Sequence, residues 1–209
     1  MQLESITLAL AKGRTSKNSI SLLQMAGYHF DDFDEDTRKL VFDDHHKRMK
    51  LISVKAVDVP TYVEKGAADI GIVGKDNILE AQSNIYELLD LSFGKCKFVV
   101  AGMSKTLQYK SRLIVASKYP VVAQNHFEAK GVPIETIKLN GSVELAPLIG
   151  MADVIVDIVE TGRTLRENGL SIIEEMDDIS TRLIVNKASF ATKTNAIEQF
   201  ITKIKTVLE

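Results

Sequence analysis

The sequence predicts an α/β fold made of two lobes, each built on a mixed or parallel sheet, with a cleft between them, and three observations lead to that prediction. Short apolar runs typical of buried strands alternate with segments of helical periodicity, which favours mainly parallel sheets covered by helices on both faces. About ten strand-like segments occur in 209 residues, which is more strands than one sheet usually contains. No repeat, low-complexity tract or Pro/Gly-rich linker interrupts the chain, so the lobes are expected to meet where strands cross over.

The strand predictions rest on runs of apolar and β-branched residues bounded by polar or turn residues. In chain order these runs are residues 6–11, 39–44, 48–54, 69–73, 86–91, 95–103, 112–117, 134–139, 153–159, 170–176 and 181–186. The polar segment HHK separates the second run from the third, so these two are expected to form a hairpin. The run DVIVDIV at 153–159 indicates a strand buried within a sheet.

The helix predictions rest on capping residues, stop residues and helical spacing. In chain order the segments are residues 16–27, 60–66, 77–82, 119–131, 142–151, 165–169 and 190–208. Thr15 or Ser16 is the expected N-cap of the first helix and Gly27 its end. Pro147 is expected to interrupt the helix at 142–151, and the last helix is amphipathic.

Composition narrows the class of protein. Apolar residues make up 45% of the chain and the net charge is −2, so no general basic field points to nucleic acid as a partner. Cys96 is the only cysteine, which excludes an internal disulfide and suits a reducing cytosol. The N-terminal apolar run is too short for a signal peptide, and no segment approaches the ~20 apolar residues of a membrane helix. A cytoplasmic protein without membrane contact is expected.

Small and polar residues gather at the end of the strand predicted at 153–159. They are Asp157, Glu160, Thr161, Gly162, Arg163 and Thr164. In open parallel sheets ligands bind outside the carboxyl ends of the strands. The glycine lets the backbone approach a ligand closely, and successive N–H groups with two threonine hydroxyls form a nest for an anion, to which Arg163 adds charge. The two acids would repel phosphate but accept hydrogen bonds from a sugar diol or meet Mg²⁺. The simpler alternative is that Thr164 caps a helix and both acids are solvated.

Several further segments follow one another in a characteristic order. They are LALAKGR, DTRKLVF, DVPTYVEKGAADIGIVGKD, YELLDL, CKFVVAG, GSVELAPLIGMADVIVDIVETGRTLRENGL and TRLIVN. Together, from Leu8 to about Asn186, they resemble the catalytic subunit of the ATP phosphoribosyltransferase family in its short form, which acts in the first step of histidine biosynthesis. The resemblance implies a periplasmic-binding-protein-like pair of α/β lobes (type II). The first lobe would be residues 1–98 plus 184–209, and the second 99–183, carrying the loop at 160–164.

The resemblance also implies partners. The chain ends at Glu209, whereas the long form of the family continues into a regulatory domain. The expected partner is therefore a separate regulatory subunit resembling histidyl-tRNA synthetase, with a homodimer of this chain inside a hetero-oligomer.

The implied reaction joins N1 of the adenine of ATP to C1 of phosphoribosyl diphosphate and releases pyrophosphate. Neutralising the leaving group and positioning the purine would carry most of the catalysis. By the resemblance, Lys12, Arg14 and Arg38 contact pyrophosphate, and Asp157, Glu160, Thr161, Gly162, Arg163 and Thr164 hold the ribose and its 5′-phosphate. Asp76, Glu144 and Lys55 are assigned to ATP and ribose. Mg²⁺ is the expected cofactor, held mainly by substrate with no assigned protein ligand.

Some positions depart from the family pattern, and alternatives remain open. Ala11 stands where the family often has proline, and Lys55 occupies a usual arginine position, keeping charge but losing the planar fork. His45 and His46 suggest a metal, but adjacent histidines in a polar turn are more simply solvated. A general base cannot be named, and N1 of adenine already carries a lone pair. The alternative functions are a two-lobed anion- or solute-binding protein without catalysis and a purine phosphoribosyltransferase, although the latter usually has two adjacent acids in its loop.

Overall fold

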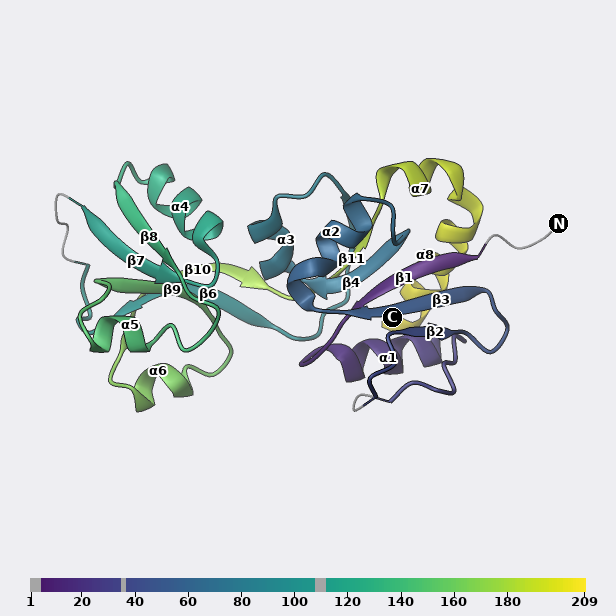
Figure 1. Cartoon of the computed structure of the whole chain (residues 1–209), viewed down its shortest axis with the longest axis horizontal. Coiled ribbons are helices and arrows are strands. Elements are labelled where there is room, and N and C mark those ends of the chain that lie inside the picture. Colours follow the sequence, from purple (N-terminus) through teal and green to yellow (C-terminus); the bar gives the residue numbers. More distant parts are fainter. Residues whose placement is uncertain (1–4, 35–36, 108–111) are drawn as a thin grey trace. The chain divides into compact units, whose positions relative to one another are not determined.

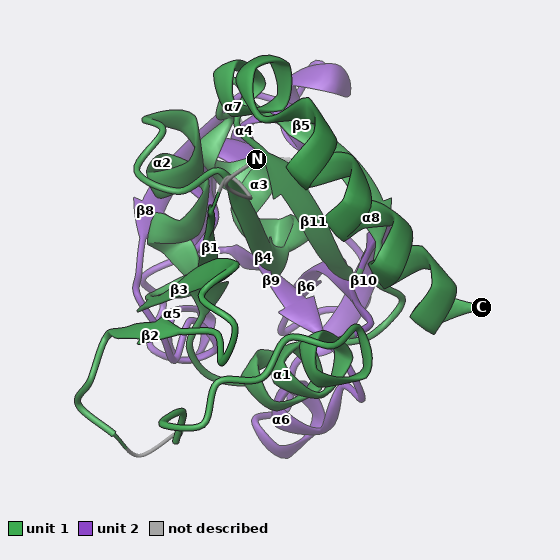
Figure 2. Ribbon diagram, turned by 90° about the vertical axis from the view of Figure 1, so that its right-hand side faces the viewer, with its two compact units in different colours: residues 1–94, 180–209 green, residues 95–179 purple. Residues whose placement is uncertain are grey.

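The chain forms two compact units. The computed structural model describes residues 5–34, 37–107 and 112–209 (Figure 1). Unit 1 comprises Met1–Gly94 and Ser180–Glu209, and unit 2 comprises Lys95–Ile179 (Figure 2). The chain therefore passes between the units after Gly94 and after Ile179, four residues before the positions expected from the sequence.

Unit 1 is built on a six-stranded sheet. Its order is β2 (Val41–Asp43), β3 (Met49–Val54), β1 (Ile6–Ala11), β4 (Ile70–Gly74), β11 (Thr181–Val185) and β5 (Tyr86–Asp90). The helical elements of this unit are α1 (Ser16–Met25), η1 (Ala56–Asp58), α2 (Val59–Glu64), α3 (Lys75–Ala81), α7 (Lys187–Thr192) and α8 (Thr194–Leu208). The expected hairpin is confirmed, because β2 and β3 pair antiparallel.

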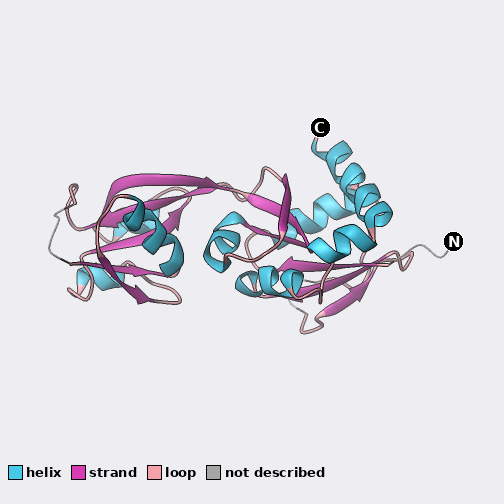
Figure 3. Ribbon diagram, turned by 90° about the horizontal axis from the view of Figure 1, so that it is seen from above, coloured by secondary structure: helices cyan, strands magenta, loops and turns pink. Residues whose placement is uncertain are grey.

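Unit 2 is built on a five-stranded sheet. Its order is β10 (Ser171–Ile179), β6 (Cys96–Gly102), β9 (Val154–Val159), β7 (Leu113–Ser117) and β8 (Ile134–Lys138). The helices of this unit are α4 (Pro120–Ala129), α5 (Leu145–Leu148) and α6 (Arg163–Glu167). Figure 3 shows the strands of each unit with its helices around them.

Both sheets are mixed, so the expectation of two lobes built on mixed or parallel sheets is confirmed. In unit 1, β1 pairs parallel with β3 and β4, whereas β2 and β11 pair antiparallel with their neighbours. In unit 2, β7 pairs parallel with β8 and β9, whereas β6 pairs antiparallel with β9 and β10. The antiparallel pairs involve the β2–β3 hairpin and the strands next to the two passages between units, which are β5, β6, β10 and β11. Local periodicity does not reveal how strands pair.

Alternate residues of the strands in unit 1 enter two different cores. On β1, Leu8 and Leu10 belong to the core that α1 and α8 cover, whereas Ala9 and Ala11 belong to the core that α2 covers. Helix α2 comes very close to β4, because a Cβ built on Gly71 would lie 2.8 Å from Val63 Cγ2. The helices thus cover both faces, as the strand pattern predicts.

A buried aspartate ties the C-terminal helices to the sheet. Asp69, just before β4, accepts hydrogen bonds from Thr7 N at 2.8 Å, Ser189 Oγ at 2.7 Å and Lys193 Nζ at 2.8 Å. Lys193 separates α7 from α8 with non-helical angles, φ −116° and ψ 30°. The single helix expected at 190–208 is therefore wrong, and the break lies where Lys193 reaches Asp69.

Two further element predictions need correction. The helix expected at 142–151 is reduced to α5, Leu145–Leu148, because Ser142 (φ +49°) and Gly150 (φ +73°) adopt left-handed conformations on either side of it. The strand expected at 170–176 continues to Ile179, with irregular register against β6. Charged residues of β10 hide the strand pattern over its last three positions, 177–179.

Candidate functional site

In unit 1 the predicted site residues lie at one edge of the sheet. β1, β3 and β4 run parallel, so the residues that follow them lie at the same carboxyl edge: Lys12 and Arg14, Lys55, and Asp76 respectively. Arg38 precedes β2, whose first residue Val41 pairs with Ile52 near the end of β3, so it belongs to this edge as well. The sequence did not reveal this convergence, because it depends on strand order.

The turn after β1 is shaped by Gly13. Its φ of +99° lies in the left-handed region that glycine adopts without strain. Lys12 N donates to Val54 O at 2.8 Å, which fixes the turn to the end of β3, and Ser16 N donates to Gly13 O at 2.9 Å as α1 begins. Thr15 occupies the N-cap position but makes no side-chain capping bond.

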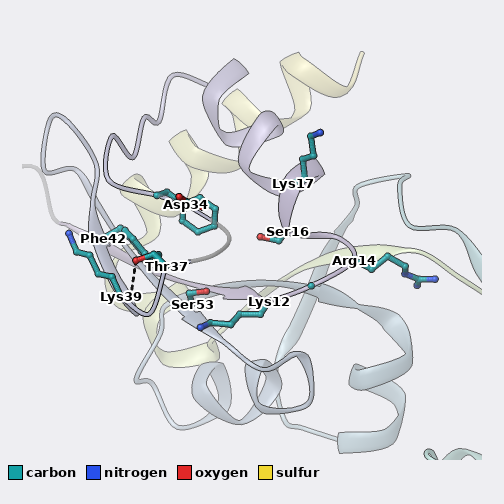
Figure 4. A pocket seen from close by; sticks show the side chains of 11 residues that line it. Lys12, Arg14, Ser16, Lys17, Asp34, Thr37, Lys39, Phe42 and Ser53 are labelled. Atoms are coloured by element: carbon teal, nitrogen blue, oxygen red, sulfur yellow. Dashed lines mark hydrogen bonds between the residues drawn. The ribbon is translucent and has the colours of Figure 1, made fainter. Parts of the chain in front are cut away.

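A cavity of about 430 Å³ opens beside this turn. It is lined by Lys12, Gly13, Arg14, Ser16, Lys17, Phe33, Asp34, Thr37, Lys39, Phe42 and Ser53. Four of these side chains are cationic and one is acidic, so the cavity favours an anion. In Figure 4, Lys12 extends toward Ser53, whereas Arg14 points away from the other lining side chains.

Arg38 and Lys55 are exposed and lie outside the lining of this cavity. Arg38 stands between two lining residues, Thr37 and Lys39. The Lys39 ammonium group is held by Asp32 at 2.7 Å, and it lies 5.3 Å from the centre of the Phe42 ring. Lys55 is the N-cap residue of η1, has extended backbone angles and directly follows β3.

Asp76 is buried at the first turn of α3, with 5% of its surface exposed. Its Oδ2 accepts a hydrogen bond from Asn77 Nδ2 at 2.8 Å, and its Oδ1 lies over Gly74, where a Cβ would collide with it. Gly74 has ordinary extended angles, φ −64° and ψ 141°, so the glycine is needed for space and not for its backbone.

In unit 2 the remaining predicted residues lie at the carboxyl edge of β7, β8 and β9, which run parallel. Glu144 is half-buried at the start of α5, in the connection that follows β8. Ser142, two residues before it, has a φ of +49°, an uncommon conformation for a residue with a side chain. The loop that holds Glu160–Gly162 follows β9 at the same edge.

The turn after β9 is compact and centred on Gly162. This residue has a φ of +69° and serves as the N-cap of α6, so the alternative of Thr164 as N-cap does not hold. The first N–H groups of α6 have no carbonyl partner within the helix. Arg163 N donates to Thr161 Oγ1 across a long 3.4 Å, and backbone N–H groups at a helix N-terminus are suited to bind an anion.

The two arginines of α6 have different surroundings. Arg163 Nε donates to Glu167 Oε1 at 2.7 Å along the exposed side of the helix, so its charge is partly neutralised. Arg166 Nη1 donates to Thr161 O at 2.9 Å and lies against Gly162. Arg166 therefore places a cation on the turn, a role the sequence analysis missed. Its spacing of five residues from Thr161 is the only sequence signal for it.

Asp157 is half-buried within β9, and its Oδ1 accepts the N–H of Ile158 at 2.8 Å. Val159, two residues on, pairs with Lys97 of β6. The ammonium group of Lys97 is held by Glu175 at 2.6 Å, and this hydrogen bond raises the pKa of Lys97 above its ordinary value. Lys97 is thus engaged with β10.

Two general features of the described residues bear on ligands. No group of three or more His, Cys, Asp or Glu side chains among them is placed to hold a metal ion, and His45 pairs with Asp31 at 3.0 Å. No helix in the described part of the chain is both long and apolar enough to cross a membrane.

The fold and these edges define a class: an α/β protein of two units whose carboxyl edges present cations in one unit and an amide-rich turn in the other. A model of the ATP phosphoribosyltransferase family matches residues 55–206. The ATP phosphoribosyltransferase of Oceanobacillus iheyensis is 56% identical over 207 residues, covering 99% of this chain and 100% of the relative. That of Clostridioides difficile is 52% identical over 201 residues, covering 95% and 96%. The chain belongs to the ATP phosphoribosyltransferase family.

Solved structures agree. The chain matches the ATP phosphoribosyl transferase (HisG:HisZ) complex from Thermotoga maritima with a TM-score of 0.87 and 35% identity, covering 98% of each chain. It also matches the VFT2 domain of Bordetella pertussis BvgS with a TM-score of 0.55, covering 98% of this chain and 91% of that one. At 12% identity the second likeness shows the fold alone. The expected two-lobed α/β fold class is confirmed.

Proposed function

We propose that this chain is the catalytic subunit that transfers the phosphoribosyl group of phosphoribosyl diphosphate to N1 of the adenine of ATP, releasing pyrophosphate, in the first step of histidine biosynthesis. The observation that carries this conclusion is family membership along essentially the whole chain, at 56% identity over 207 residues with one relative. The amide-rich turn after β9 supplies a place for the sugar phosphate that the reaction needs.

The reaction breaks the bond between C1 and the pyrophosphate oxygen as N1 of adenine bonds to C1. The electron pair of the broken bond leaves with pyrophosphate, so cations at that group lower the barrier. Lys12 and Arg14 line the cationic cavity of unit 1, and Arg38 stands at the same edge. These three residues are assigned to pyrophosphate. N1 of adenine carries its own lone pair for the attack, and no general base is assigned.

The ribose and its 5′-phosphate are assigned to the turn after β9. The N–H groups of Thr161, Gly162, Arg163 and Thr164 and the threonine hydroxyls would bind the phosphate. Asp157 and Glu160 would accept hydrogen bonds from the ribose hydroxyls, because a carboxylate only accepts such bonds and each hydroxyl can donate one.

ATP is assigned to Asp76, Lys55 and Glu144. Asp76 is a buried carboxylate held in one orientation by Asn77, which suits recognition of a donor group on the nucleotide. Lys55 supplies charge at the same edge of unit 1, and Glu144 stands at the edge of unit 2. Holding both substrates in a reactive orientation would supply much of the rate enhancement.

Mg²⁺ is the proposed cofactor. Asp157 already accepts a hydrogen bond from Ile158, and Glu160 is exposed, so these two carboxylates fit an ion that arrives with substrate better than a cage made by the protein. The ion would neutralise negative charge on the pyrophosphate leaving group.

The solved relative from Thermotoga maritima is a complex of two kinds of chain. We propose that this chain likewise assembles with a regulatory subunit, one resembling histidyl-tRNA synthetase, as a homodimer within the hetero-oligomer. The substrates are metabolites of the cytoplasm, which is the proposed location. No observation favours a non-catalytic binding protein, because the likeness to the BvgS domain extends to fold only.

The direct test mixes the purified chain and its partner with Mg²⁺, ATP and phosphoribosyl diphosphate. Phosphoribosyl-ATP is the expected product, with free adenine a poor acceptor. Failure to form that product with the partner present, or equal activity on adenine, would contradict the assignment.

A further inference from the structure

Ser117 joins the carboxyl ends of three strands in unit 2. It is the last residue of β7 and is fully buried, with 0% of its surface exposed. Its Oγ donates to the carbonyl of Val156 on β9 at 2.6 Å and accepts the N–H of Tyr119 at 2.8 Å. Its backbone carbonyl accepts the N–H of Leu139, the residue after β8, at 3.0 Å. A single residue therefore connects β9, β8 and the turn into α4.

The hydroxyl of Ser117 contacts β9 at the point where the pairing between β9 and β7 ends. Val156 is the last residue of β9 in register with β7, whereas Asp157, Ile158 and Val159 pair with β6. Hydrogen-bonding groups alternate between the two sides of a strand, so the N–H of Ile158 faces the same side as the carbonyl of Val156. There β7 has ended, and the N–H donates to Asp157 Oδ1 at 2.8 Å instead.

Two side-chain contacts thus satisfy backbone hydrogen-bonding groups on the side of β9 that no longer pairs with β7, just before the turn at 160–164. One comes from Ser117 and supports Val156. The other comes from Asp157 itself and fixes the direction of its carboxylate. The first contact reaches across 39 positions of the chain and joins the last residue of β7 to β9.

We propose that Ser117 is a positioning residue for phosphoribosyl diphosphate. It holds the end of β9 so that Asp157 and the turn at 160–164 keep the geometry that receives the ribose and its phosphate. This inference rests on the proposed function of that turn. The hydroxyl acts through Val156 and does not touch the substrate.

Removing the Ser117 hydroxyl tests its role without removing the backbone contact between residue 117 and the end of β8. In Ser117→Ala the carbonyl of Val156 and the N–H of Tyr119 each lose the hydrogen bond to the hydroxyl, and losing such a bond inside the protein is costly. The bond from Leu139 to the backbone carbonyl of residue 117 remains. The disturbance is therefore directed at β9 with its following turn and at the turn into α4, while the contact with β8 is kept.

A matched control is Ser189→Ala in unit 1. Ser189 is also buried, and its Oγ donates to Asp69 Oδ1 at 2.7 Å, but it lies outside every element that carries a proposed site residue. Both variants lose one buried hydroxyl: Ser117→Ala loses its bonds to Val156 and Tyr119, and Ser189→Ala loses its bond to Asp69. A merely structural role predicts that both lower the melting temperature and leave the affinity for substrate unchanged.

The experiment measures the dissociation constant of phosphoribosyl diphosphate with Mg²⁺, by calorimetry on the full chain, and KM for the same substrate in the assembled enzyme. We expect Ser117→Ala to weaken binding and raise KM by about tenfold or more, because small misplacements in a site have large effects. Ser189→Ala should keep the wild-type values. Ser117→Cys, which retains the size of the side chain but donates weakly, should fall between Ser117→Ala and wild type.

A folded Ser117→Ala protein that binds phosphoribosyl diphosphate as wild type does would overturn the inference. If that variant does not fold, Ser117→Cys decides, and an unchanged dissociation constant there overturns it equally. Failure of the wild-type chain to bind phosphoribosyl diphosphate is a separate result, which would contradict the proposed function instead.

Discussion

Asp76 folds its carboxylate back over Gly74, so that one oxygen occupies the space a Cβ of residue 74 would need. The backbone of Gly74 is extended and would accept any residue. The glycine at the end of β4 is therefore required by the orientation of a neighbouring acid. Asp76 is buried and held by Asn77, so its carboxylate is fixed in that orientation, which is the one ATP would meet under the proposed function.

Gly74→Ala should displace Asp76 with little loss of stability. Alanine fits the backbone and restricts the unfolded chain, which by itself stabilises by about 0.4–1 kcal/mol. We expect KM for ATP to rise in Gly74→Ala, as it should also rise in Asp76→Ala. The melting temperature should change by only a few degrees. Steady-state kinetics on both variants provides the check. A Gly74→Ala enzyme with wild-type KM for ATP would show that the orientation of Asp76 is irrelevant.

Gly162→Val should abolish binding of phosphoribosyl diphosphate. The φ of +69° disfavours a side chain, and a Cβ there would lie 3.1 Å from Arg166 Nη1, so the turn must rearrange. Gly131→Val is a matched control, because Gly131 has a φ of +70° and open space around it at the end of α4. Both variants should lose about 1–2 kcal/mol from backbone strain. Calorimetric titration should separate them, and equal affinity in the two would remove the turn from the site.

Asp69→Ala should strongly destabilise unit 1. The change leaves Thr7 N, Ser189 Oγ and Lys193 Nζ without their shared acceptor, and losing several hydrogen bonds to a buried carboxylate costs about 3 kcal/mol. Urea unfolding measures the effect. Lys205→Met, a change of an exposed lysine on α8, should alter the free energy of unfolding by less than about 0.5 kcal/mol. A loss below about 1 kcal/mol in Asp69→Ala would contradict the role given to this cluster.

Asp44 should contribute to the fall in stability in acid. Burial raises the pKa of Asp44, but the His29 N–H and the Arg48 guanidinium lower it by more, so the pKa lies below the ordinary carboxyl value. Such a group stabilises the fold above the unfolded pKa of about 3.9, and this contribution is lost as pH falls through the folded pKa. Asp44→Asn should be less stable than wild type at pH 7, and the difference should shrink below about pH 4. Unfolding free energies measured from pH 7 to 2 test this, and a constant difference would count against it.

Much of the fold can be predicted from local patterns. The apolar runs at 6–11 and 153–159 appear as β1 (Ile6–Ala11) and β9 (Val154–Val159), and the turn after the second run contains the left-handed glycine expected there. These features depend on neighbouring residues, so a short window of sequence suffices. The break at Lys193 was missed because its cause is Asp69, 124 positions away.

The same distinction applies to the candidate site. Residue types at the ends of strands indicated Lys12, Asp76 and the turn at 160–164, and the resemblance to the family supplied their expected roles. Ser117 and Arg166 carry no motif of their own, since each acts through a carbonyl group that only the folded chain brings near. Arg38 and Lys55 lie at the same carboxyl edge of the sheet as the residues after β1. This placement depends on strand order, which is set by pairing between distant segments.

The central claim is that the turn after β9 receives the sugar phosphate, and a crystal structure of the chain with phosphoribosyl diphosphate and Mg²⁺ tests it most directly. The 5′-phosphate should lie within hydrogen-bonding distance of the backbone N–H groups of residues 161–164, with the ribose hydroxyls facing Asp157 and Glu160. Phosphoribosyl diphosphate bound elsewhere, with this turn unchanged and empty, would contradict the account.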